Sequence, residues 1–155
     1  MSICDEIVVM DQGQIQQKGH PQEVYDNPKN LFVAKFLGTP PIHIFSGEIA
    51  GGQLMLDGAP VLQVSLPDSA VTVGIRPEGF VPDQDGALVC AFRGLEVMGR
   101  DTTVLCAHNA CQTAIRAIVP SELAQAPAEE TIRFSLKPEK VFFFDNAGRR
   151  LYPEG

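Results

Sequence analysis

The chain has 155 residues, of which 45% are hydrophobic and 20% charged, a balance typical of a globular protein rather than a disordered segment. Its net charge of −7 argues against a nucleic-acid partner, because phosphate backbones attract clustered Lys and Arg. No apolar run approaches the roughly 20 residues that span a bilayer, so we expect no direct insertion into a membrane.

The chain is predicted to begin with a β-hairpin. Residues 7–10 form a short apolar run, as in a buried strand. Residues 11–13, Asp-Gln-Gly, are a turn signal, and residues 14–17 continue as a second and more polar strand.

Two short helices are expected next. Pro21 suits the first position of a helix over residues 21–26, because the N–H that proline lacks would be unpaired there. Pro28 interrupts the helical run, so a second helix is predicted over about residues 29–37. Gly38 follows it as the expected C′ residue.

A stiff Thr39-Pro40-Pro41 segment marks the predicted domain boundary. It divides the chain into residues 1–38 and 39–155. The apolar side chains of Val33, Phe36 and Leu37 are expected to pack on the second part or on another molecule, or else to be disordered.

Residues 39–155 are predicted to be almost entirely β, as a small sandwich or barrel, with one helical turn near Ser121. The evidence is a series of short β-branched and aromatic runs separated by Gly, Pro, Asp and Asn. The predicted strands are residues 43–49, 53–56, 62–64, 71–76, 87–97, 102–107, 112–118, 131–136 and 141–145.

One short internal repeat organises this second part. Residues 73–81 and 134–142 both read apolar, small, apolar, basic, Pro, Glu, any residue, apolar, apolar. Each Pro-Glu pair is expected to end a strand and redirect the chain, because proline cannot donate to a central ladder. The repeat suggests two related half-barrels.

Three segments carry a resemblance to a known family. Residues 5–38, from DEIVVMDQGQI to NLFVAKFLG, resemble the end of the nucleotide-binding domain of ABC importer ATP-binding subunits that serve sugar or glycerol-phosphate uptake. The sequences VGIRPE (residues 73–78) and LKPEKVFFFD (residues 136–145) resemble the TOBE regulatory domain, an OB-like β-barrel that follows the ATPase core in these subunits.

The resemblance implies a role in regulation and dimerisation within an importer. The full-length parent would be a transport ATPase that uses ATP and Mg, is cytoplasmic, and lies at the inner face of the cell membrane through its permease subunits. In such subunits the accessory domains of two copies touch. The resemblance therefore implies a homodimer through residues 39–155, which we call the β-domain.

The chain itself is not expected to be an enzyme or to hold a cofactor. A phosphate-binding loop needs a Gly-Lys pair, and none of the five lysines follows a glycine. Residues 7–11 imitate the strand that ends on a magnesium-linked Asp, but a hairpin strand is the simpler interpretation. Gly51-Gly52 imitates the ABC signature loop and is interpreted as a hairpin tip.

The cysteines are interpreted as free thiols, with no metal site, because the paired short spacings of a zinc site are missing. If His108-Asn109 is a tight turn, Cys106 and Cys111 would face each other across a hairpin.

The alternative function is a small-ligand sensor for an oxyanion or a sugar phosphate. Its candidate contacts are the polar residues expected at strand ends: Arg76, Arg100, Ser135 and Lys137. Arg76 and Glu78 could also contact a partner, although such residues more often pair locally at the end of a strand.

Overall fold

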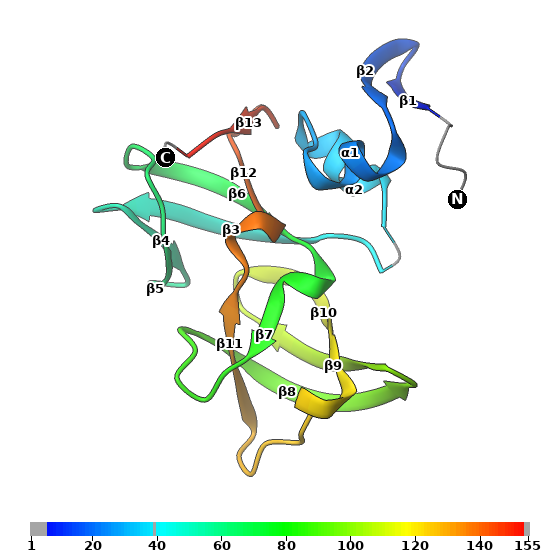
Figure 1. Cartoon of the computed structure of the whole chain (residues 1–155). Coiled ribbons are helices and arrows are strands. Elements are labelled where there is room, and N and C mark those ends of the chain that lie inside the picture. The colour runs from blue at the N-terminus through cyan, green and yellow to red at the C-terminus, as the bar shows by residue number, and fades with distance from the viewer. Residues whose placement is uncertain (1–5, 39, 154–155) are drawn as a thin grey trace.

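A computed structural model describes residues 6–38 and 40–153 (Figure 1). Cys4, Asp5 and the predicted boundary residue Thr39 lie outside the described residues. Within the described ranges, no helix is both long and apolar enough to cross a membrane.

The first part of the chain has the predicted hairpin and helices. The hairpin pairs β1 (Ile7–Asp11) with β2 (Gln14–Gly19), and both turn residues, Gln12 and Gly13, have positive φ. The strand that imitates a magnesium-binding motif is therefore a hairpin strand, as interpreted from its turn.

The helices are α1 (Pro21–Asp26) and α2 (Leu31–Phe36). The first has the predicted bounds, whereas the second begins two residues later than predicted. Asn30 explains the later start, because its side chain accepts a hydrogen bond from the backbone N–H of Val33 and so caps the helix. Gly38 follows the C-cap Leu37 with a φ of 113°, which confirms its predicted place at C′.

The rest of the chain is a curled antiparallel sheet that forms a half-barrel, consistent with an OB-like barrel, so the mainly β prediction is confirmed. The strands are β3 (His43–Ala50), β4 (Gln53–Leu56), β5 (Ala59–Gln63), β6 (Ser69–Ile75), β7 (Phe80–Pro82), β8 (Leu88–Met98), β9 (Asp101–His108), β10 (Cys111–Pro120), β11 (Thr131–Leu136), β12 (Val141–Phe144) and β13 (Arg150–Leu151). The 3-10 turns are η1 (Pro77–Gly79), η2 (Ser121–Leu123) and η3 (Pro138–Lys140).

Every predicted strand overlaps an observed strand, and the sequence missed two short ones. Neither β7 nor β13 has the length or the alternation that makes a strand readable from sequence. The predicted Gly51-Gly52 tip is a turn between β3 and β4, and η2 is the expected helical turn.

The internal repeat becomes a pair of interlocked turns, η1 and η3. The strand β12 pairs with β6 from Val141 opposite Ile75, and β11 pairs with β7 from Leu136 opposite Phe80. Across the turns, the N–H of Arg76 donates to the Lys140 carbonyl at 3.0 Å, and the N–H of Lys137 donates to the Gly79 carbonyl at 2.9 Å. The two copies of the repeat therefore exchange equivalent hydrogen bonds and join the two halves of the β-domain.

The predicted facing of Cys106 and Cys111 is wrong. Cys111 lies opposite His108 and Cys106 lies opposite Ile115, because the turn is Asn109-Ala110 and a register shift follows it. Cys90, Cys106 and Cys111 are buried free thiols. A hydrogen bond with Cys90, together with burial, raises the pKa of the Cys106 thiol.

Three apolar clusters are found among the described residues. The main core, which includes Phe45, Phe80 and Phe134, belongs entirely to the β-domain. A small cluster of Val9, Val24 and Val33 holds the hairpin to the helices. The third cluster joins the two parts of the chain, because Ala34 of α2 packs with β-domain residues Ile42, Phe142 and Phe144. The predicted packing of Val33 and Leu37 on the second part of the chain is wrong, because both lie in the cluster with the hairpin, while Phe36 is exposed.

Deletion of residues 1–38 should leave the β-domain folded, because the main core contains none of these residues. The truncated protein should melt several degrees lower, since the deletion uncovers Phe142 and Phe144. Near-ultraviolet circular dichroism and a thermal melt test both statements. Loss of the aromatic signal would show that the boundary at Thr39 does not separate an independently folding unit.

Candidate functional site

Arg76 is the most fully enclosed charged residue at the junction between the helices and the β-domain. It follows β6, and its side chain is 0% exposed. Its Nη2 donates to the Tyr25 carbonyl at 2.7 Å, and its Nη1 donates to the carbonyls of Ala34 at 2.9 Å and Leu37 at 3.0 Å. We call this group of contacts the Arg76 clasp.

The clasp satisfies the carboxyl ends of both helices. The last carbonyls of a helix have no partner within the helix and carry partial negative charge, so a cation there is favourable. Tyr25 lies in the last turn of α1, Ala34 in the last turn of α2, and Leu37 is the C-cap of α2. One side chain of the β-domain therefore caps two helices of the preceding segment.

Aromatic rings complete the enclosure of the guanidinium. Its central carbon lies 3.9 Å from the centroid of the Tyr25 ring and 5.6 Å from that of Phe142. Burial lowers the pKa of Arg76, but an arginine remains charged at neutral pH. Its Nε is buried without a hydrogen-bond partner, so the clasp holds the charge mainly through carbonyl dipoles and ring faces.

Glu78 lies beside the clasp at its solvent edge. The Tyr25 hydroxyl is 2.7 and 2.9 Å from the two carboxylate oxygens of Glu78 and donates to them. Burial and this hydrogen bond raise the pKa of the Tyr25 hydroxyl. Lys140 lies 3.6 Å from Glu78 and 3.7 Å from Asp26. These partly exposed pairs contribute little stability individually, but they align η1 and η3 with the end of α1.

The other predicted contact residues do not converge on one site. Ser135 lies within β11 opposite Val81, and Lys137 is exposed at the start of η3. Arg100 is exposed in the turn between β8 and β9, where its carbonyl accepts from the Ser121 N–H at 2.8 Å. Arg76 and Glu78 are thus brought together with Tyr25 and Lys140, whereas Arg100 belongs to a separate turn.

A second arginine, Arg150 of β13, is not one of the candidate contacts that the sequence suggests, although the adjacent Arg149-Arg150 pair can be seen there. Its Nη1 donates to the Pro28 carbonyl at 2.7 Å and to Asn27 Oδ1 at 3.0 Å. Its guanidinium carbon lies 4.7 Å from the ring centroid of Phe142 and 4.6 Å from that of Tyr152. Burial lowers the pKa of Arg150.

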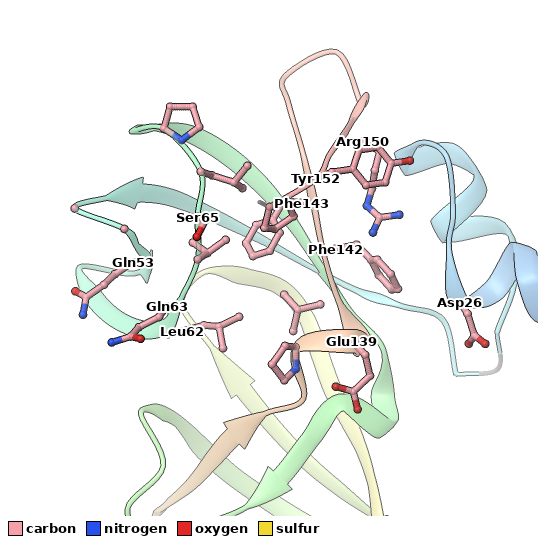
Figure 2. Close-up of a pocket in the computed structure, with 18 residues that line it drawn as sticks. Asp26, Gln53, Leu62, Gln63, Ser65, Glu139, Phe142, Phe143, Arg150 and Tyr152 are labelled. Carbon is pink, nitrogen blue, oxygen red and sulfur yellow. The ribbon is translucent and has the colours of Figure 1, made fainter. Parts of the chain in front are cut away.

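Arg150 lines a cleft of about 1100 Å³ between β12, β13 and the segment that follows β5. Figure 2 shows Phe142, Arg150 and Tyr152 on one side of this cleft and Gln53, Gln63 and Ser65 on the other. Among the described residues, no three His, Cys, Asp or Glu side chains are grouped so that they could hold a metal ion.

Comparison with known proteins shows that nearly the whole chain is similar to part of import ATP-binding proteins. It is 36% identical over 155 residues to an sn-glycerol-3-phosphate import ATP-binding protein of Jannaschia sp., covering 97% of this chain and 43% of that protein. It is 34% identical over 161 residues to a sulfoquinovosyl glycerol transport ATP-binding protein of Agrobacterium fabrum, covering 97% of this chain and 44% of that protein. No family model matches the sequence. The chain thus spans less than half the length of these relatives.

Proposed function

Because the chain is homologous over nearly its whole length to the C-terminal part of importer ATP-binding proteins, we propose that it is the regulatory and dimerisation region of such a subunit. The parent protein would bind ATP and Mg, hydrolyse ATP, and power uptake of a carbohydrate or a glycerol phosphate through permease subunits. It would be cytoplasmic and peripheral to the membrane. This region would contribute no catalytic group of its own.

The Arg76 clasp is the observation that carries this proposal. A contact between two β-domains can keep two ATPase domains at high effective concentration only if each β-domain is firmly attached to its own ATPase domain. The clasp and the cluster around Ala34 supply this attachment, because both join the β-domain to the helices that correspond to the end of the ATPase domain.

The proposed contact surface lies at the end of the β8–β9 hairpin. Val97 and Met98 are 73% and 69% exposed, the largest exposed fractions among the large hydrophobic residues that the structure describes. Leu123 of η2 is also exposed. Leu123 lies near this end of the hairpin because η2 also contains Ser121, whose hydroxyl is 2.8 Å from that of Thr102. Thr102 in turn lies opposite Val97. Val97 and Met98 are consecutive strand residues on opposite faces of the hairpin, and exposed apolar side chains at one hairpin end are typical of interaction surfaces.

We expect the chain to be a dimer by light scattering at tens of micromolar, and the double substitution Val97→Asp, Met98→Asp to make it monomeric. Two carboxylates at the centre of an apolar contact would remain desolvated and unpaired, which opposes association. Both positions are exposed in a single chain, so the variant should retain its circular dichroism spectrum.

Ile15→Asp is the matched control, because Ile15 is 63% exposed but lies on the β1–β2 hairpin. This variant should remain dimeric. A wild-type monomer would overturn the dimerisation role. Dissociation caused by Ile15→Asp, with no effect of the double substitution, would place the contact on the hairpin instead.

A further inference from the structure

The cleft beside β13 combines a fixed cation with aromatic and amide side chains. Phe143 and Tyr152 contribute ring surface, while Gln53 and Gln63 contribute amides that can both donate and accept hydrogen bonds (Figure 2). Sites for small organic ligands typically have this composition, in which an apolar surface carries a few polar groups that set the orientation of the ligand.

Arg150 is a cation of this cleft that has no ion-pair partner among the described residues. The ion pairs among the described residues all belong to Lys140, which lies near Asp26 and Glu78, so none of the described carboxylates lies within ion-pair distance of Arg150. Glu139 and Asp26 also line the cleft, but neither forms a hydrogen bond with Arg150 within the described part of the chain. A partly desolvated cation without a counter-charge favours an anionic ligand.

The guanidinium is held in place before any ligand binds. Two hydrogen bonds fix Nη1 to the loop between α1 and α2, and the Phe142 and Tyr152 rings lie against the guanidinium plane. In the described part of the chain, Nη2 makes no hydrogen bond and is not buried, whereas Nε is buried without a hydrogen-bond partner. Arg150 therefore keeps a donor available without losing its anchor, and a preorganised donor reduces the entropy lost on binding.

We propose that this cleft binds a small organic anion, with a phosphate or carboxylate group on Arg150 and a hydroxylated body between Tyr152 and the Gln53–Gln63 side. The planar guanidinium suits both kinds of oxyanion. Neither the dimer contact nor the parent's ATPase activity is needed for this site, so the two proposals fail independently.

Isothermal titration calorimetry of the full chain tests the site with glucose 6-phosphate, glycerol 3-phosphate, gluconate, inorganic phosphate and neutral glucose. At least one of the organic anions should bind, and glucose should give no heat. Arg150→Gln should weaken binding by about tenfold or more, because it removes a charge-assisted hydrogen bond. Arg149→Gln, at the exposed neighbouring position, should bind as the wild type does.

Amide chemical shifts of the wild-type protein give a test that does not depend on folding of the Arg150 variant. Titration with the best-binding probe should move the signals of Gln63, Phe143 and Tyr152 more than those of the β8–β9 hairpin. Absence of binding by all three organic anions at millimolar concentration would overturn the proposal. So would unchanged affinity in Arg150→Gln, shifts centred elsewhere, or inorganic phosphate binding as tightly as the organic phosphates.

Discussion

Replacement of Arg76 by methionine is expected to lower the free energy of unfolding by about 4 kcal/mol. Methionine can fill much of the space but cannot donate, so the carbonyls of Tyr25, Ala34 and Leu37 lose the partner that the clasp provides. Buried acceptors without a partner carry most of this cost. Urea unfolding, followed by circular dichroism, measures the change.

Two controls separate the clasp from a general effect of losing an arginine. Arg100→Met removes the same charge from an exposed turn and should change the unfolding free energy by no more than about 0.5 kcal/mol. In a protein truncated to residues 39–155 the three carbonyls are absent, so Arg76→Met should cost much less there. An equal cost in both backgrounds would show that the clasp does not act through the helices.

The second large effect is expected at Gly86, where alanine should destabilise the protein by about 3 kcal/mol. A β-carbon at this position would lie 2.4 Å from the carbonyl carbon and oxygen of Phe134 and 2.8 Å from its nitrogen. These are backbone atoms of β11, which cannot move without disturbing its pairing with β7 and β8. The segment between β7 and β8 can cross β11 this closely only without a side chain.

Gly94→Ala is the matched control for Gly86→Ala. A β-carbon at Gly94 would meet only the Leu105 Cδ1 atom, at an ordinary contact distance of 3.9 Å. Its unfolding free energy should stay within about 1 kcal/mol of the wild type. A melting temperature of Gly86→Ala equal to that of Gly94→Ala would contradict the close approach of Gly86 to β11.

The two arginines stabilise the junction in the same way, by donating hydrogen bonds to backbone carbonyls. Arg76 and Arg150 both extend from the β-domain to backbone carbonyls in or near the helices, at Tyr25, Ala34 and Leu37 for one and at Pro28 for the other. They differ in enclosure, because Arg76 is fully buried whereas Arg150 lines a cleft. For this reason we assign attachment of the two parts to Arg76 and ligand binding to Arg150.

The sequence predicted the local features of the fold well. Each depended on residues close together in the chain: the hairpin at Gln12-Gly13, the helix that begins at Pro21, the C′ glycine at Gly38 and the two Pro-Glu turns. It missed β7 and β13, and it misplaced the turn that separates Cys106 from Cys111. Strands of two or three residues depend on a partner strand rather than on their own pattern.

The mainly β class, the repeat and the resemblance to importer ATP-binding subunits can all be inferred from the residues, because ordered motifs and local periodicity carry that information. The contacts of Arg76 and Arg150 become visible only in the folded chain. The carbonyls that accept from the Arg76 side chain lie 42, 39 and 51 residues before it, and the Pro28 carbonyl lies 122 residues before Arg150. Backbone carbonyls have no side-chain identity, so no residue pattern can reveal which of them an arginine will reach.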